Sequence, residues 1–443
     1  MFFSKDISET FLINAALHYT KGQGYFEQYK ADENLSDYGF TGPDFGTGVI
    51  DTTDLIRRRW LDNDFYGFTL SGQYNPNKDV EVIVGGAWSK YDGDHFGEII
   101  WAEITGDAKI RDRYYDNNGL KTDYNVYAKG TIGLGSAVSV FADIQYRGID
   151  YTLFGLDNDG LFLDSNYTFS FLNPKVGISY FLNDNQSLYA SFSVGNKEPS
   201  RADIIDNTSG IIPTHETLYD VEAGFRRNRS RLQVNANFYY MNYKNQLVLT
   251  GELNDVGASL RTNVPRSYRT GIELDLGYKI SEILTLRANA TFSQNIIEEY
   301  TEIIYDYGPN FDEFNVIERK FENTSISFSP GLIAGGTIRY TPIMGLSLAW
   351  VNKYIGDQFL DNTGDPTRKI DGYYISDFRA NYNFAAFGLK GISINLAVYN
   401  IFNNLYEANG YTWGYIGGGS EVRENFFYPQ AGINFMAGIT LKL

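Results

Sequence analysis

The last fourteen residues, QAGINFMAGITLKL at positions 430–443, decide the fold that the sequence predicts. Apolar side chains alternate there with small or polar ones, and a period of two indicates a β-strand with one apolar face. That face would carry Phe435, Ala437, Ile439, Leu441 and Leu443. Soluble proteins seldom leave such a strand at a free terminus, because its unpaired edge would promote aggregation. The strand therefore needs a partner, which a closed barrel supplies by pairing the last strand with the first.

The same alternation recurs along the whole chain. Clear examples are residues 80–88, 138–146, 232–240, 272–280, 284–292 and 392–398. In several of these segments the opposite face is polar, as in Gln233, Asn235 and Asn237. Polar faces of this kind suit a water-filled lumen, and the apolar faces would then meet lipid.

The connections between these segments alternate between short and long. Short turns are predicted at 75–79, 133–137, 182–185, 227–230, 281–283, 341–345 and 385–391. Long polar loops are predicted at 21–55, 93–121, 151–165, 196–216, 250–260, 297–322, 357–371 and 403–430. This alternation is typical of outer-membrane barrels, which have short periplasmic turns and long extracellular loops. The sequence predicts an all-β fold, a transmembrane antiparallel β-barrel of the outer membrane with about 16 strands.

The composition agrees with this prediction and excludes several other classes. The chain has 443 residues, no Cys and a formal net charge of −17. It lacks an 18-residue apolar run, which excludes transmembrane helices. The acidic balance argues against nucleic-acid binding, and the absence of Cys excludes disulfides and thiolate metal sites in this chain. The N-terminus shows no signal peptide, and residues 11–19 already alternate as a strand.

Five ordered segments carry a family resemblance. They are VGNKEPSRAD (194–203), PTHETLYDVEAG (213–224), TNVPRSYRTGIELDL (262–276), VYNIFNNLYE (398–407) and YPQAGINFMAGITLKL (428–443). In this order and spacing they resemble the C-terminal part of a TonB-dependent outer-membrane receptor of the Bacteroidetes type. The matching residues are Pro199, Ser200, Glu216, Glu222, Gly224, Asn263, Gly271, Glu273, Asn400, Phe402, Tyr406, Pro429 and Gly432.

The resemblance implies a barrel-assembly signal in the final strand. Its residues would be Phe435, Gly438, Ile439, Leu441 and Leu443. Two positions depart from the family pattern: Ile433 stands where Arg is common, and the chain ends in Leu443 rather than Phe. The second departure could weaken recognition by the barrel-assembly machinery.

The resemblance also implies a domain plan. Family members carry an N-terminal plug domain inside a 22-stranded barrel, so residues 1–443 would be the C-terminal part of the receptor barrel, with about 16 strands present of 22. The plug domain, the TonB box and the first strands would be absent from this sequence. The alternative is that 16 strands close on themselves, since an open sheet in lipid would leave two unsatisfied edges.

The function implied is active uptake through the TonB complex, which would act on the plug. The ligand would be a ferric siderophore first, with cobalamin, haem or glycan as alternatives. The chain would also contact lipopolysaccharide and outer-membrane lipid. Rival hypotheses are a passive 16-stranded diffusion porin and an adhesion scaffold. With three His and no nucleophile motif, an enzyme is not predicted, and neither a cofactor nor a metal site is assigned.

Eight residues are candidates for ligand contact: Tyr25, Tyr29, Arg57, Arg58, His95, Trp101, Tyr411 and Trp413. Loop aromatics give rigid contact area, although the same rings could form the interfacial girdle. The arginines at 57–59 could attract an anionic siderophore or lipopolysaccharide phosphate, or could pair with nearby aspartates. His95 lies among Asp92, Asp94, Glu98 and Glu103, which could hold a cation or simply form a solvated loop.

Overall fold

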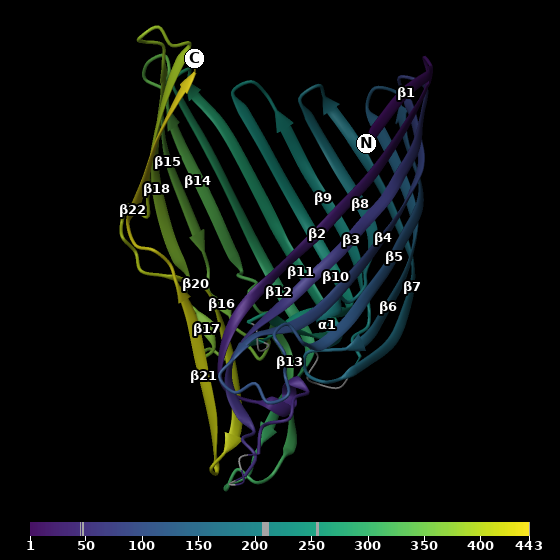
Figure 1. Cartoon of the computed structure of the whole chain (residues 1–443). Coiled ribbons are helices and arrows are strands. Elements are labelled where there is room, and N and C mark those ends of the chain that lie inside the picture. Colours follow the sequence, from purple (N-terminus) through teal and green to yellow (C-terminus); the bar gives the residue numbers. More distant parts are fainter. Residues whose placement is uncertain (45, 47, 206–211, 254–256, 443) are drawn as a thin grey trace. The chain divides into compact units, whose positions relative to one another are not determined.

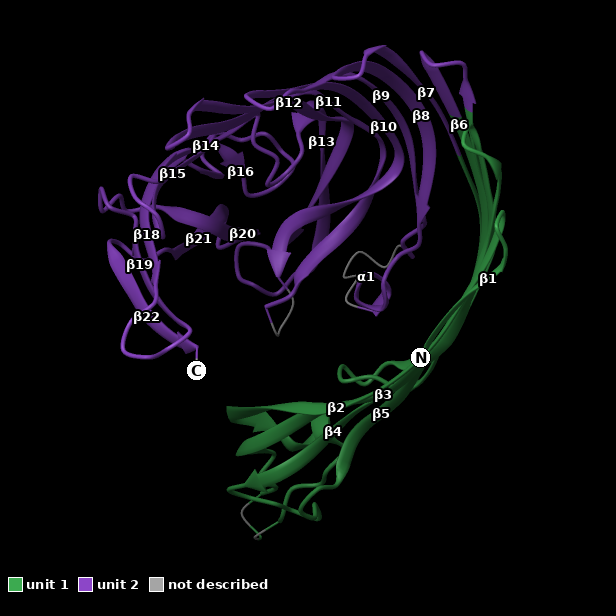
Figure 2. Cartoon of the chain, turned by 90° about the horizontal axis from the view of Figure 1, so that it is seen from above, with its two compact units in different colours: residues 1–132, 141–174 green, residues 133–140, 175–443 purple. Residues whose placement is uncertain are grey.

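The computed structural model describes residues 1–442 apart from 45, 47, 206–211 and 254–256 (Figure 1). The chain divides into two compact units (Figure 2). Unit 1 comprises residues 1–132 and 141–174, and unit 2 comprises residues 133–140 and 175–443. Among the described residues, no helix has the length and apolar character needed to cross a membrane.

Unit 1 is built from long antiparallel strands. They are β1 (Phe2–Ser8), β2 (Phe11–Asn34), β3 (Thr52–Asn77), β4 (Val80–Ala102) and most of β5 (Arg113–Leu134) and β6 (Val138–Leu156), with the first part of β7 (Phe162–Asn183). Each of β1 to β4 pairs with the strand that follows it in the sequence. A short 3-10 helix, η1 (Leu35–Tyr38), follows β2, and its Tyr38 packs with Leu55, Ile99, Tyr114 and Tyr115 in a small core.

Unit 2 continues the same pattern. Its elements are β8 (Gln186–Lys197), α1 (Arg201–Ile205), β9 (Glu216–Asn228), β10 (Leu232–Leu253), β11 (Ser259–Ser281), β12 (Leu284–Asp306), β13 (Asn315–Ser325), β14 (Leu332–Tyr340), β15 (Leu346–Ile355), β16 (Gln358–Phe359), β17 (Lys369–Ile370), β18 (Tyr373–Phe384), β19 (Gly391–Tyr399), β20 (Glu407–Gly417), β21 (Ser420–Pro429) and β22 (Asn434–Lys442). Strand β12 pairs with β13 near its loop end and with β14 near its turn end. In the view of Figure 2, β16, β20 and α1 fall within the curve of the unit 2 sheet.

One face of β11 is apolar and exposed. In β11, Ile272, Leu274 and Leu276 are exposed, whereas Glu273 and Asp275 occupy the opposite face. A soluble protein would bury such a row, and large exposed apolar surfaces mark interaction or membrane sites. The alternation apolar-out and polar-in is that of a membrane barrel strand, so the predicted fold class is confirmed as all-β and antiparallel.

All seven predicted short turns are confirmed. They fall between β3 and β4, β5 and β6, β7 and β8, β9 and β10, β11 and β12, β14 and β15, and β18 and β19. The long loops are shorter than predicted, because the strands extend far into them. Strands β2 and β3, for example, remain paired up to Asn34 and Thr52, within the predicted loop 21–55. These extensions carry polar cross-strand pairs, such as Lys21 opposite Asp64, so the sequence shows no apolar alternation there.

The predicted number of about 16 strands is wrong. The described part of the chain contains 22 strands. Breaks on the loop side divide several long crossings in two, as between β13 and β14 or between β19 and β20. Strand β1 was also not predicted, because adjacent Phe2 and Phe3 break the alternation in FFSKDIS.

The C-terminal strand is confirmed. Strand β22 pairs antiparallel with β19, and its apolar face meets an apolar face: Phe435 lies opposite Val398, Ile439 opposite Ile394 and Leu441 opposite Ile392. Strand β1 pairs with β2 along one edge. Pairing of the last strand with the first stays a prediction, and Leu443 lies outside the described residues.

Candidate functional site

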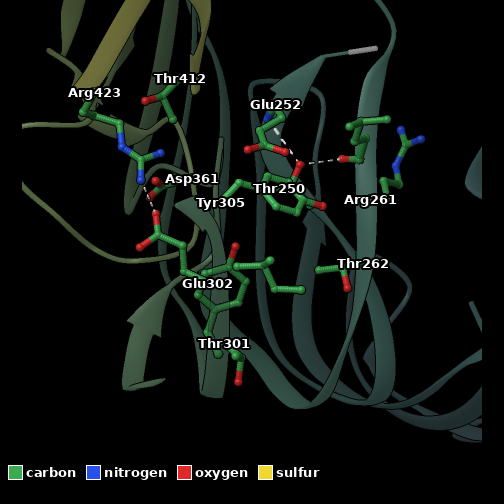
Figure 3. A pocket seen from close by; sticks show the side chains of 13 residues that line it. Thr250, Glu252, Arg261, Thr262, Thr301, Glu302, Tyr305, Asp361, Thr412 and Arg423 are labelled. Carbon is green, nitrogen blue, oxygen red and sulfur yellow. Dashed lines mark hydrogen bonds and ion pairs between the residues drawn. The ribbon is translucent and has the colours of Figure 1, made fainter. Parts of the chain in front are cut away.

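A small polar cavity lies at the loop end of unit 2 (Figure 3). It has a volume of about 70 Å³, which is room for a few water molecules or one small polar group, not for a whole siderophore. Its walls come from β10, β11, β12, β20, β21 and the segment between β16 and β17. The polar lining residues are Thr250, Glu252, Arg261, Thr262, Tyr300, Thr301, Glu302, Tyr305, Asp361, Thr412 and Arg423.

A buried arginine organises this region. Arg368 Nη1 donates to Glu302 Oε1 at 2.6 Å and to Asp361 Oδ2 at 2.8 Å. All three residues are buried, with exposed fractions of 6% or less. Arg423 Nη2 donates to the same Glu302 oxygen at 2.7 Å (Figure 3). The charged groups are therefore removed from water but paired with one another. Pairing offsets the free energy that desolvation of several charges costs.

These ion pairs join four segments that are distant in the sequence. Glu302 lies on β12, Arg368 between β16 and β17, and Arg423 on β21; Arg319 of β13 joins them by donating to Glu421 at 2.8 Å. We call Glu302, Arg319, Asp361, Arg368, Glu421 and Arg423 the ionic hub. The hub ties the β20–β21 hairpin to the loop end of β12, next to the contact of Ile416 with Asp306.

The segment that carries Arg368 is held by its own side chains. Asp361 Oδ1 accepts from the Thr363 backbone N–H at 3.0 Å, a local turn typical of aspartate. Asn362 accepts from the Ser327 N–H at 2.9 Å and donates to the Leu249 carbonyl at 2.5 Å. Asn362 is fully buried, so these bonds fix the segment against β10 and the connection after β13.

Charge and burial shift the pKa values of two carboxyl groups in this region. Burial raises the pKa of Glu252, Arg423 partly offsets this, and Glu302 and Asp361 raise the pKa further. A hydrogen bond from Arg319 lowers the pKa of Glu421. Within the described chain, Glu302 Oε2 is buried without a hydrogen-bond partner. The cavity is thus acidic and accepts a proton or a hydrogen-bond donor more readily than an anion.

The hairpin β20–β21 has a second, aromatic face. Tyr411 stacks on Phe426 with ring centroids 4.7 Å apart, and Trp413 stacks on Tyr415 at 5.5 Å. Alternation along β20 turns Thr412 toward the cavity and Tyr411 and Trp413 to the other side. Trp413 is 40% exposed. The structure therefore brings the two predicted residues Tyr411 and Trp413 together on one accessible surface.

The candidate arginines of unit 1 separate onto opposite faces of β3. Arg58 lies over the ring of Tyr25, 4.2 Å from its centroid, on one face. Arg57 lies on the other face, is buried, and donates to Gln28 and to the Tyr38 hydroxyl at 3.2 Å. Arg57 is thus packed away from solvent beneath η1, and its contact with a ligand stays a prediction.

His95 and two of the acidic residues near it in the sequence lie on different faces of β4. Alternation along β4 puts His95 on the face opposite Asp92 and Asp94, and Asn118 donates to both aspartates. No group of three or more potential ligand residues that could hold a metal ion is present among the described residues. Tyr29 and Trp101 are exposed on the same face as Tyr25 and Arg58.

The ionic hub was not predicted from the sequence. Its partners are separated by up to 121 positions, as for Arg423 and Glu302, and no local pattern connects them. The only sequence signal was the DNTGD segment at 361–365, whose Asp, Asn and Gly residues are typical of an ordered turn.

The antiparallel strands with exposed apolar faces, short turns and longer structured loops are those of the membrane β-barrel class. A sequence model of the family described as "TonB dependent receptor-like, beta-barrel" matches residues 3–401. The chain belongs to this family.

Solved structures show the same fold at low sequence identity. The ferric-catecholate import receptor Fiu from E. coli K12 matches with 14% identity and a TM-score of 0.66, over 99% of this chain and 62% of Fiu. The siderophore receptor PiuA from Acinetobacter baumannii matches with 14% identity and a TM-score of 0.71, over 99% of this chain and 63% of PiuA. The copper transporter OprC matches with 13% identity and a TM-score of 0.72, over 99% of this chain and 64% of OprC.

The chain therefore spans less than two thirds of the length of each of these proteins. Comparison of the sequence with curated proteins finds no match.

Proposed function

We propose that this chain is part of an outer-membrane receptor that takes up a scarce ferric siderophore with energy supplied through the TonB complex. The family match over residues 3–401 carries the proposal. The similar structures support it, because the names of Fiu and PiuA state ferric-catecholate import and siderophore reception. The name of OprC states copper transport, so other metal cargoes belong in any test.

Residues 1–443 are proposed to be the C-terminal part of the receptor barrel, with a plug domain and further strands supplied by preceding sequence, because several of the 22 strands, such as β13 and β14, are halves of one divided crossing. The support is that the chain covers only 62–64% of the similar structures. The mass of the native polypeptide tests this. A species far heavier than the 50.1 kDa of this sequence is expected. A native species of 50.1 kDa would instead favour the passive porin.

The partners follow from this plan. TonB would act through the plug domain, and the barrel-assembly machinery would recognise β22 through Phe435, Gly438, Ile439 and Leu441. The exposed apolar faces would lie in outer-membrane lipid. The outer-membrane location is thus proposed together with the uptake function.

The aromatic face of β20–β21 is the proposed cargo contact. Large rings supply rigid contact area at low entropy cost, and such residues dominate binding energy. The ionic hub holds the hairpin in place from its other side, so the rings are positioned before cargo arrives. Preorganisation of this kind increases affinity by reducing the ordering cost of binding.

The cargo is identified by growth of a gene-deletion strain and its complemented parent under iron limitation. Ferric catecholate, ferric hydroxamate, ferric citrate and haem are supplied singly as iron source, with cobalamin, copper and oligosaccharide tested in separate uptake assays. The proposal expects that the deletion abolishes growth on at least one ferric siderophore. Loss of uptake of haem, cobalamin, copper or glycan alone would overturn the siderophore assignment.

Binding to the purified full-length receptor then tests the contact surface. Trp413→Ala is expected to weaken cargo binding by about tenfold or more, because central aromatic contacts carry most binding energy. Phe427→Ala is the matched control, since Phe427 lies on the other face of the same hairpin with a similar exposed fraction of 42%. Equal effects of the two substitutions would contradict the assignment of the face.

A further inference from the structure

The loop-side half of strands β2 to β5 presents an outward face whose function the uptake mechanism leaves unassigned. Outward means the face of the exposed apolar residues, such as Phe68 and Leu70 of β3. On this face, Tyr66 lies 5.9 Å from Trp88, with Tyr19 opposite Tyr66 and Tyr124 opposite Trp88. These four rings correspond to the interfacial aromatic girdle of a membrane barrel. The strands continue well beyond the girdle on the loop side.

An aromatic row and an ionic row cross the strands above the girdle. Tyr25, Trp60 and Phe96 lie opposite one another on β2, β3 and β4, with ring centroids 4.5 Å and 5.8 Å apart. In the next row, Glu27, Arg58, Glu98 and Arg113 alternate in sign across four strands. Arg58 Nε donates to Glu27 at 2.8 Å, and Trp60 Nε1 donates to Glu98 at 3.0 Å. The polar groups are therefore fixed, and their net charge is zero.

A third row leaves rings open to solvent. Tyr29 and Trp101 flank Ile56 on the same face and are 60% and 47% exposed, and Tyr25 is 48% exposed. Tyr25 and Tyr29 are four residues apart along β2, and Tyr29 and Trp101 are two strands apart. These spacings give a platform of about 13 Å by 10 Å, the footprint of a short oligosaccharide rather than of one ring. A role limited to strand pairing would not require rings this exposed.

The distance of the platform from the girdle limits which part of a membrane lipid the platform can contact. Trp60 and Ile56 lie six and ten residues beyond Tyr66 along β3, which corresponds to about 15 Å and 25 Å above the girdle for a tilted strand. This is too far for acyl chains. Between girdle and platform, Asp62, Asp64, Asp92 and Asp94 outnumber Lys21 and Lys90, so the surface disfavours direct contact with phosphate.

We propose that this face binds the sugar chain of a glycolipid in the outer leaflet of the membrane. The C–H faces of pyranose rings pack on aromatic faces, and fixed carboxylates and guanidinium groups accept from and donate to neutral hydroxyls. The outward direction presents the face to neighbouring lipid headgroups rather than to the transport path. The inference rests on the outer-membrane location in the proposed function but not on the identity of the cargo.

The test measures binding of the full-length receptor, in nanodiscs, to two forms of lipopolysaccharide, one with its complete core oligosaccharide and one lacking the core sugars. The unsubstituted receptor is expected to retain the complete form roughly tenfold more tightly. The double substitution Tyr29→Ala with Trp101→Ala is expected to remove this preference. Phe26→Ala should keep it within about twofold, because Phe26 is 46% exposed but lies on the opposite face of β2.

The inference would be overturned by equal binding of both lipids, by an unchanged preference in the double variant, or by equally tight binding of the free core oligosaccharide, which would indicate a soluble glycan. A protein cross-linked to this face in cells would also overturn it. Heat-modifiable migration confirms that each variant has folded. Cargo uptake, measured in parallel with the unsubstituted receptor, separates the two proposals, since a receptor without uptake that still prefers the complete lipid would fail only as a transporter.

Discussion

At the scale of single residues, the stability of the loop side of unit 2 depends on Arg368. Its guanidinium group compensates two buried carboxylates, Glu302 and Asp361. Removal of one partner from a buried ion pair leaves the other charge uncompensated, which is much more costly than the loss of a surface pair. Buried Arg368 and its more exposed neighbour Lys369 should therefore differ in how much they stabilise this region.

Arg368→Ala is expected to destabilise the hub by about 3–5 kcal/mol. Hydrogen exchange of residues 357–371 and 407–429 measures this as faster opening of both segments. Lys369→Ala is the control, because Lys369 pairs with Asp357 at the surface and such pairs contribute about 1 kcal/mol or less. Similar exchange in the two variants would show that the buried network does not hold the hairpin.

Glu252 predicts a pH dependence of the same region. Its folded pKa is raised above the ordinary value of 4.5, mainly by burial. The folded state thus binds the proton more tightly, so this stabilisation is complete below pH 4.5 and is lost as the pH rises through the shifted pKa. After correction for the intrinsic rise of amide exchange with pH, the protection of the hub amides should decrease as the pH rises above 4.5. Glu252→Gln should remove the part of this slope that Glu252 contributes, and an unchanged slope would contradict the account.

At the scale of elements, the two faces of β22 should tolerate charge very differently. Ile439→Arg places a cation on the apolar face beside Ile394, and arginine on the lipid face near the bilayer midplane costs about 2–4 kcal/mol. Thr440→Arg places the same cation on the polar face. Heat-modifiable barrel in the outer membrane should fall sharply for Ile439→Arg and remain near normal for Thr440→Arg. Equal losses would mean that the assigned faces are wrong.

The turns could be predicted from the sequence, but the full strand lengths could not. Turns such as 133–137 interrupt an apolar alternation, which is a local signal. The loop-side extensions of β2 and β3 alternate polar residues, and their pairing depends on partners such as Lys21 and Asp64 that are 43 positions apart. The ionic hub could not be predicted for the same reason, because its partners are distant in the sequence. By contrast, Tyr411 and Trp413 could be identified, because two residues of separation on a strand already put them on one face.

At the scale of the whole molecule, we propose that the chain forms the energised barrel of a receptor rather than a passive pore. A passive porin would let cargo through without an energy source, and an adhesion scaffold would bind without transport. The aromatic and ionic surfaces at the loop end would serve binding in either receptor or scaffold, so dependence on energy distinguishes the three.

Accumulation of radiolabelled ferric siderophore distinguishes the receptor, the porin and the scaffold. Iron-limited cells are compared with and without the gene for this chain, each in the presence and absence of a functional TonB complex. The account predicts that accumulation requires both, while surface binding of the siderophore persists without TonB. Accumulation that requires the gene but continues without TonB would contradict the account in favour of the porin, and binding without accumulation in any strain would favour the scaffold.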